Sequence, residues 1–409
     1  MQIADVTIEI GRDGGSLRGV AADGAATFAA VTTGDAEAPQ TAIEARRGAA
    51  VAWTAKLAGD GGPLVRTGAL VAAVLAGTRE AAGVALRGSP GAVVVGLDAA
   101  TGAARWKLAI DSSEWVVIAA AAPAGDGGVL VAGSFGGTLR AGAKVVSSGG
   151  RSDGFVARVS AAGEAALLVR MGGPGADAIQ GVAAADGRLA IAGTFAAGAD
   201  LLGTPLDAVD ARTPYADGFV AELDPATARP RWTAVFGGKL DDAVAGVAID
   251  GRGRVVVAAQ ARDVVHVNGR DLLAQGPADA LVAWWERDGA AGPAILVGGA
   301  GFDGAAAIAA AGDRVIVGGF FSGALRAGDR AITAIAGDDA LLVALDGGAV
   351  VDAWPAGGAG REEITALAAV PGGFVAGIAH TAGTRLGGAA LGAGESGRGG
   401  HVIIVRPVR

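Results

Sequence analysis

One short phrase recurs along the chain at a nearly constant interval. It starts with aspartate and continues as a run of small and apolar residues, as in DGFVARVS from Asp153, DGFVAELD from Asp217, DALVAWWE from Asp279 and DALLVALD from Asp339. Weaker copies are GAVVVGLD from Gly91 and GHVIIVRP from Gly400. A fixed period of about 60 residues means that the chain stacks copies of one supersecondary unit.

The segment 175–238 shows what one unit contains. Apolar runs cover residues 176–184, 189–195, 219–223 and 231–236, and Gly, Pro and Asp separate them. The Asp186-Gly187 pair between the first two runs is a strong hairpin signal. Four short antiparallel strands in a repeat of this length are typical of a β-propeller blade, which buries its faces against neighbouring blades.

The sequence therefore predicts an all-β fold, a single closed β-propeller over residues 1–409 with seven four-stranded blades. The approximate blades are 12–62, 63–110, 111–173, 174–238, 239–299, 300–358 and 359–409. The last unit stops after its third strand, 401–408, so the spare strand at 4–11 is expected to complete the last blade. The second unit is short, with strands expected near 69–76, 82–87, 92–97 and 104–110, and six blades with a degenerate insert is the alternative.

Composition narrows the possible partners. The net charge is −8 and no Lys/Arg cluster stands out, which argues against nucleic acid. No apolar run reaches the roughly 18 residues of a membrane span. Cysteine is absent and the three histidines lack ligand spacing, so we expect no catalytic residue, no metal and no cofactor. The first 20 residues hold no apolar signal region, which predicts a cytoplasmic chain by default.

The order of motifs in each unit resembles a known family. A Trp strand ending in Gly-Gly, an Asp before the next strand, an Asp-Gly turn, a V/I-x-G-T/S-F strand and the DGFVA phrase together resemble the bacterial seven-bladed β-propeller repeat (SBBP repeat) family. The closest stretches are 129–159, 189–224 and 315–346. This resemblance implies a secreted or cell-surface bacterial protein.

A second resemblance is local. The phrase LDAATGAARW at 97–106, with a weaker copy at 223–232, is similar to quinoprotein-like propeller repeats. In those proteins the phrase is a structural turn with a docking Trp between blades. Their adjacent-cysteine disulfide has no counterpart here, so the resemblance carries no chemistry.

Acidic residues recur just before the innermost strand of most units. They are expected to ring one mouth of the central channel, where they could bind a cation or a basic peptide, or serve a hydrolase or lyase. The alternative is that each caps backbone N–H groups of its own turn. These residues are Glu114, Asp177, Asp242, Asp303 and Glu362.

Tryptophans form a second group of candidates. Trp106, Trp232 and Trp354 recur in the fourth strand, which predicts packing between blades. Trp284 and Trp285 are adjacent on a strand, so one faces each side, and the less deeply packed ring is a candidate for stacking on a glycan.

Long excursions separate the second and third strands at 135–152, 195–216, 261–278, 320–338 and 379–399, and each contains a mini-hairpin phrase. They could extend one face as a partner surface or pack as decorations on neighbouring blades. The sequence predicts a non-enzymatic scaffold that binds another protein or a larger assembly through this face. A glycan-binding propeller and a hydrolase or lyase with carboxylates at the channel mouth are the alternatives.

Overall fold

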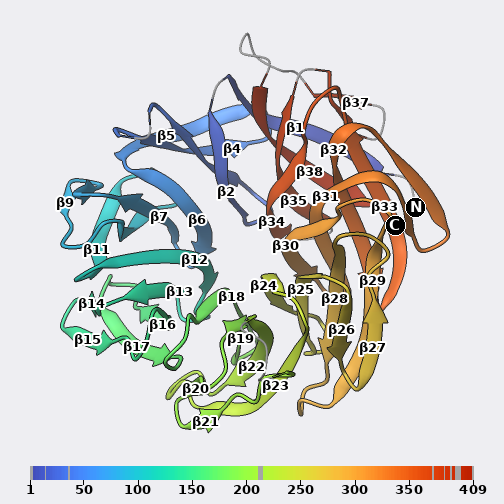
Figure 1. The fold of residues 1–409 in the computed structure, drawn as a ribbon. Helices are drawn as coiled ribbons and strands as arrows, with labels where there is room; N and C mark the ends of the chain where they lie inside the picture. The colour runs from blue at the N-terminus through green and yellow to red at the C-terminus, as the bar shows by residue number, and fades with distance from the viewer. Residues whose placement is uncertain are drawn as a thin grey trace.

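The strands of the computed structural model form a β-propeller (Figure 1). The structure describes residues 3–13, 15–35, 37–210, 215–370, 373–381, 383–386, 389–391 and 398–407, and every helix or strand within them is a β-strand. The predicted all-β propeller class is confirmed.

Antiparallel sheets of four or more strands are arranged around a central axis (Figure 1). Their innermost strands are β2 (Ser16–Ala22), β6 (Asp60–Thr67), β12 (Trp115–Pro123), β18 (Ala178–Ala185), β24 (Ala243–Ile249), β30 (Gly304–Ala311) and β34 (Glu363–Val370). These strands contact one another in a closed circuit, β2 with β6 and so on until β34 contacts β2. Residues of all of them line the same central cavity, whose wall is mostly Ala, Val and Leu. Small side chains allow the inner strands to approach the axis closely.

Each sheet continues outward through three further strands. The second strands are β3 (Thr27–Thr33), β7 (Leu70–Gly77), β13 (Val129–Gly136), β19 (Arg188–Phe195), β25 (Val255–Ala261), β31 (Arg314–Ala327) and β35 (Gly373–Thr381). The third strands are β4 (Gln40–Arg47), β10 (Gly91–Asp98), β16 (Asp153–Val159), β22 (Asp217–Leu223), β28 (Asp279–Trp285), β32 (Arg330–Asp346) and β38 (Arg398–Pro407). The outer strands are β5 (Ala50–Ala58), β11 (Ala104–Ser112), β17 (Ala165–Met171), β23 (Pro230–Gly238), β29 (Ala291–Gly299), β33 (Ala349–Gly357) and β1 (Ile3–Asp13).

The first strand of the chain completes the sheet that contains the last strand. β1 pairs antiparallel with β38, from Ile3 opposite Pro407 to Asp13 opposite Gly399. The sheet order is β1-β38-β35-β34. The expected pairing of the spare N-terminal strand is therefore confirmed, and it covers the edge that β38 would otherwise expose.

The second unit differs from its predicted strands. Its innermost strand is β6, which begins at Asp60, before the expected boundary at residue 63. The run expected first, 69–76, is the second strand β7. Residues 82–87 contribute no strand to the sheet of β6, β7, β10 and β11. They lie instead in and beside a separate short hairpin of β8 (Glu80–Ala81) and β9 (Val84–Ala85). The sequence did not predict β6, because the Gly-Gly-Pro residues near its start interrupt the alternating pattern of a strand.

The Asp-Gly turns predicted between first and second strands are present. At the turn between β18 and β19, Asp186 has φ 50° and Gly187 has φ 72°. Two successive residues in the left-handed region define the tight hairpin turn that matches strand twist, and Asp and Gly are the residues that tolerate it.

The glycine of the V/I-x-G-T/S-F motif has a packing reason. Gly133, Gly193 and Gly319 each lie on a second strand opposite a register shift in the innermost strand. A Cβ atom there would overlap a backbone carbonyl of the innermost strand, that of Ala178 in the case of Gly193. The missing side chain lets the bulged inner strand approach its neighbour.

We expect Gly193→Ala to lower the free energy of unfolding by about 1–3 kcal/mol, because the added methyl group must displace backbone atoms. Gly62→Ala is the control, since its Cβ would make only ordinary contacts with Val74, the nearest at 3.5 Å. Urea unfolding of both variants measures the difference. Equal stability of the two would show that the bulge relaxes freely.

Candidate binding face

The long excursions fold as hairpins that attach to the preceding unit. They contain β14 (Thr138–Ala141) with β15 (Lys144–Ser147), β20 (Asp200–Leu201) with β21 (Thr204–Pro205), β26 (Val264–Val267) with β27 (Arg270–Leu273), the joined ends of β31 and β32, and β36 (Arg385–Leu386) with β37 (Ala389–Ala390). β14 pairs with β11, β26 with β23, β31 with β29, and β36 with β33. The hairpins therefore bridge consecutive units at the outer rim.

The Gly-Gly pair that closes most outer strands is explained at these bridges. A Cβ on the second glycine would overlap the backbone of the incoming hairpin: Gly198 for Gly173, Val264 for Gly238 and Ala324 for Gly299. A Cβ on the first glycine would overlap a carboxylate, that of Asp217 for Gly237. Each glycine thus makes room for a different neighbour.

The acidic residues predicted to ring the channel mouth are mostly buried. Asp177, Asp242, Asp303 and Glu362 are between 0% and 4% exposed, while Glu114 is exposed. The two oxygens of Asp303 accept the N–H groups of Gly299 (2.7 Å) and Ser322 (3.1 Å). Glu362 accepts Gly358 N–H (3.1 Å) and Thr381 N–H (3.1 Å). Asp177, Asp303 and Glu362 each cap one N–H group four residues earlier and a second N–H group 19 residues later in the chain, so they do not present an open anionic ring.

The residues that start the recurring phrase are a second set of buried acids, which the sequence analysis did not single out. Asp279 is fully buried, and its Oδ2 accepts the N–H of Gln275 at 2.9 Å. Asp339 accepts the N–H of Ile335 at 2.8 Å in the same way. Their recurrence at the first position of the phrase was the available signal. At four junctions between consecutive units, the acid that starts the phrase interacts electrostatically with the acid before the next innermost strand. We call these the junction carboxylate pairs: Asp153–Asp177, Asp217–Asp242, Asp279–Asp303 and Asp339–Glu362.

Burial raises the pKa of Asp177, Asp217, Asp242, Asp279, Asp303 and Asp339. Desolvation and the charge of Asp217 raise the pKa of Asp242 to about 7. Desolvation, partly offset by two backbone hydrogen bonds, raises the pKa of Asp303 to about 6. The pKa of Asp279 is also raised, by desolvation.

The two adjacent tryptophans offer no stacking surface. Trp284 is 0% exposed and Trp285 is 2% exposed, on opposite faces of β28. Trp285 packs against Phe236 with ring centroids 6.1 Å apart. The expectation that one of the two rings is less deeply packed is wrong, because neighbouring sheets cover both faces of this strand.

The fourth-strand tryptophans dock between units, as predicted. Trp106 donates from Nε1 to the carbonyl of Ala161 at 3.0 Å, in the turn of the next unit. Trp232 covers Gly289 of the next unit, and Trp53 covers Gly102 within the LDAATG turn. Asp98 accepts the N–H groups of Ala100 and Thr101 in that turn, so the phrase is a structural turn here.

Exposed apolar side chains gather on one face. We define the excursion face as the face formed by the excursions and by the links between consecutive units. Both sets of segments leave the same ends of the strands, as shown by the bridges from Ser152 to Ala176 and from Ala278 to Phe302. Nine of the twelve large hydrophobic side chains exposed in the described part of the chain lie on this face. They are Val145, Leu202, Val209, Tyr215, Leu240, Val264, Leu273, Phe302 and Ile335.

An aromatic stack adds a defined feature to this face. Phe302, which is 37% exposed, stacks on Phe320 with centroids 5.6 Å apart. The guanidinium carbon of Arg361 lies 5.6 Å from the centre of the Phe320 ring. Aromatic rings with a nearby arginine are characteristic of protein-binding surfaces.

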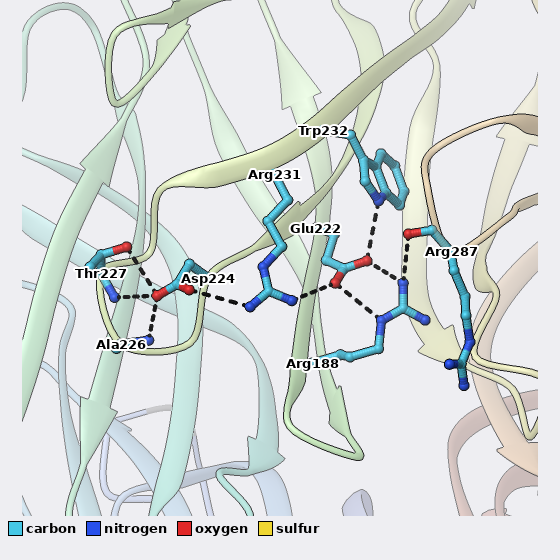
Figure 2. Close-up of polar contacts among 8 residues, drawn as sticks. All are labelled: Arg188, Glu222, Asp224, Ala226, Thr227, Arg231, Trp232 and Arg287. Atoms are coloured by element: carbon cyan, nitrogen blue, oxygen red, sulfur yellow. Dashed lines mark hydrogen bonds and ion pairs between the residues drawn. The ribbon is translucent and has the colours of Figure 1, made fainter.

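The opposite ends of the strands carry an ion-pair network (Figure 2). The buried carboxylate of Glu222 accepts from Arg188, from Arg231 at 3.1 Å and from Trp232 at 3.2 Å. Arg188 also donates to the carbonyl of Arg287 in the next unit, at 3.3 Å. Burial disfavours the charged form of Glu222, but the hydrogen bonds and charge of Arg188 outweigh it and lower the pKa. The network ties two units together.

We expect Glu222→Gln to lower the free energy of unfolding by about 3 kcal/mol at neutral pH, because it leaves the largely buried Arg188 guanidinium without its counter-charge. Since the folded pKa of Glu222 is lowered, its contribution is present above the ordinary value of 4.5 and is lost as the pH falls. The difference from wild type should therefore shrink in acid, as measured by urea unfolding at several pH values. Glu164→Gln, at an exposed site, should have little effect at any pH.

Among the described residues, no group of three or more His, Asp or Glu side chains is placed to hold a metal ion. That same part of the chain has no helix long and apolar enough to cross a membrane.

No family model matches the sequence, and no curated protein matches it either. Solved structures similar to the chain include the Dos1 propeller (TM-score 0.45, 9% identity, 99% of this chain and 98% of that one) and a europium-containing methanol dehydrogenase (TM-score 0.41, 11% identity, 98% and 93%). A neuraminidase-like protein of subtype N10 from A/little yellow-shouldered bat/Guatemala/060/2010 also matches (TM-score 0.40, 8% identity, 99% of both chains). Likeness at this level carries no argument about function, and the resemblance to SBBP repeats stays a prediction.

Proposed function

We propose that this chain is a seven-bladed, non-enzymatic scaffold that binds another protein through its excursion face. The observation that carries the proposal is the concentration of exposed apolar side chains on that face. Large hydrophobic side chains exposed together on one surface mark interaction sites in soluble proteins.

Seven blades are supported by the strand pairing of the second unit and by the closed circuit of innermost strands. β6, β7, β10 and β11 pair in sequence order within one sheet, as expected for a full blade. β34 contacts β2 at the other end of the circuit, and β1 completes the sheet of β34. A closed ring gives the binding face a fixed curvature.

The hairpins support the scaffold interpretation because each is anchored at its base. β26 pairs with β23 at Gly237 and Gly238, while β27, on its far side, exposes Leu273 by 65%. Ile335, on the β32 strand of another excursion, is 69% exposed. Anchored loops lose little conformational freedom on binding, which favours affinity.

The geometry gives less support to the alternatives. A hydrolase or lyase at the channel mouth would use the predicted acids Glu114, Asp177, Asp242, Asp303 and Glu362. The oxygens of Asp177, Asp303 and Glu362 already accept backbone N–H groups. Asp242 is only 4% exposed, and Glu114 alone of the five is exposed. A glycan-binding site would need an exposed face on Trp284 or Trp285, and both rings are buried. The scaffold function is therefore the one that the described residues support best.

The test is affinity capture from the native cell with wild type and a Leu273→Glu/Ile335→Glu double variant. We expect the double variant to lose at least about tenfold of a specific partner, because two exposed apolar contacts become charged. Val51→Glu and Val351→Glu change similarly exposed apolar residues outside the excursion face, and should retain the partner. Equal loss from the face variant and the controls would reject the face, and a partner set unchanged in all variants would reject the proposal.

A further inference from the structure

The junction carboxylate pairs contain oxygens that the fold leaves without a donor. Asp153 Oδ1, Asp279 Oδ1, Asp339 Oδ1 and Asp242 Oδ2 are buried and have no hydrogen-bond partner. Their residues are 0%, 0%, 1% and 4% exposed. A buried carboxylate oxygen without a partner costs several times the free energy of an ordinary hydrogen bond, so such sites are normally compensated.

The unpartnered oxygens lie beside the Gly-Gly pair that ends an outer strand, where two units meet. We call this pair the glycine step. A Cβ on Gly298 would overlap Asp279 Oδ1, and a Cβ on Gly357 would overlap the carboxylate of Asp339. The next residue, Gly299 or Gly358, donates its N–H to the second acid of the pair, Asp303 or Glu362. Both carboxylates of a pair thus converge on the same two residues of the outer strand.

At one junction a cation balances the charge of the acids, although it contacts the other oxygen of Asp153. At the Asp153–Asp177 pair, Arg170 Nη1 lies 2.6 Å from Asp153 Oδ2. Arg170 is opposite Phe155 in the sheet, and the residues at the equivalent register positions are Val235, Leu296 and Pro355. The other three junctions therefore carry two acids and lack this arginine.

Few other charges face the three pairs. The charges of Asp217, Asp241 and the cation Arg262 act on Asp242, and the charge of Asp210 acts on Asp217. Asp303 experiences Asp279 and Asp338, and Asp338 is paired with Arg361 at 3.4 Å. Asp339 faces Glu362. In each pair the partner acid exerts the strongest charge effect on a buried acid, which makes double ionisation unfavourable.

We propose that the Asp217–Asp242, Asp279–Asp303 and Asp339–Glu362 pairs each hold one proton between their two carboxyl groups in the folded protein, and that these shared protons make the propeller more stable in mild acid than at alkaline pH. The proton comes from solvent as the chain folds, and one carboxylic acid O–H donates to the partner carboxylate. No other bond forms or breaks.

A proton fits these pairs better than a metal ion. Hard divalent cations take six or more oxygen ligands, whereas backbone N–H groups already occupy the other oxygen of Asp279 and both oxygens of Asp303. A single proton satisfies the unpartnered oxygen and removes one charge. The inference is independent of the proposed binding function.

The direction of the pH dependence follows from linkage. The folded pKa of Asp242 is raised from 3.8 to about 7 and that of Asp303 to about 6. The folded state therefore binds more protons than the unfolded state, so stability is full below the ordinary pKa and falls as the pH rises through the folded values.

The experiment measures unfolding in urea between pH 5 and pH 8 for wild type, Asp242→Asn and Asp279→Asn. In wild type we expect the unfolding equilibrium constant to rise at least about tenfold over this range. Each Asn variant mimics the protonated acid, so it should show a smaller rise and be at least as stable as wild type at pH 8. Asp288→Asn, an exposed acid, should keep the wild-type dependence. Wild-type stability that is flat or increases with pH would overturn the proposal, as would Asn variants with the wild-type dependence.

A second measurement keeps the proposal testable if the Asn variants fail to fold. Infrared spectra of folded wild type at pH 5.5 should show a carboxylic acid C=O band, because ordinary aspartates and glutamates are ionised there. The band should disappear on unfolding at the same pH. Absence of the band in the folded protein would overturn the proposal.

Discussion

Contact between consecutive units depends on the glycine step that ends the outer strands. At Gly298 and Gly299 the backbone lacks side chains, so a carboxylate occupies one side and the incoming hairpin the other. The N–H of Gly299 is then available to the acid of the next unit, Asp303. Sheet pairing, capping and the bridge between units all use these two residues. A side chain at either position would displace backbone atoms or a buried carboxylate, which explains why the pair recurs.

The two ends of the strands solve the problem of buried polar groups differently. At the excursion end, carboxylates accept backbone N–H groups, and three of the four junctions hold acids without a paired arginine. At the opposite end, Glu222 is surrounded by Arg188, Arg231 and Trp232 (Figure 2). Protonation of the junction carboxylate pairs is expected to stabilise the excursion end, and ionisation of Glu222 is expected to stabilise the opposite end. Both ends are therefore expected to be stable at intermediate pH. The proposed binding surface lies at the excursion end.

Much of the architecture was predictable because it depends on local chemistry. Asp186-Gly187 forms a hairpin turn through its own φ preferences, and the spacing of the recurring phrase identified the third strands. Docking of Trp106 between units followed from its register. The strand β6 was missed because its first residues, Asp-Gly-Gly-Pro, lack strand propensity, and pairing with β7 holds it in place. The depth of Trp284 and Trp285 was also misjudged, since only the neighbouring sheets determine how far each face of β28 is covered.

The sequence by itself determined the repeating unit, its turns and the need to stack copies, because alternation, glycine and Asp-Gly signals act over a few residues. Tertiary structure alone decided what the recurring acids do. Asp279 and Asp303 lie 24 residues apart in the chain, and only ring packing brings them to the same glycine step. Likewise, the exposed apolar residues belong to separate excursions, and only the arrangement of the strands places them on one face. The burial of the acids and the collection of exposed apolar residues on one face arise only when the units pack into a ring, so no local sequence pattern could show them.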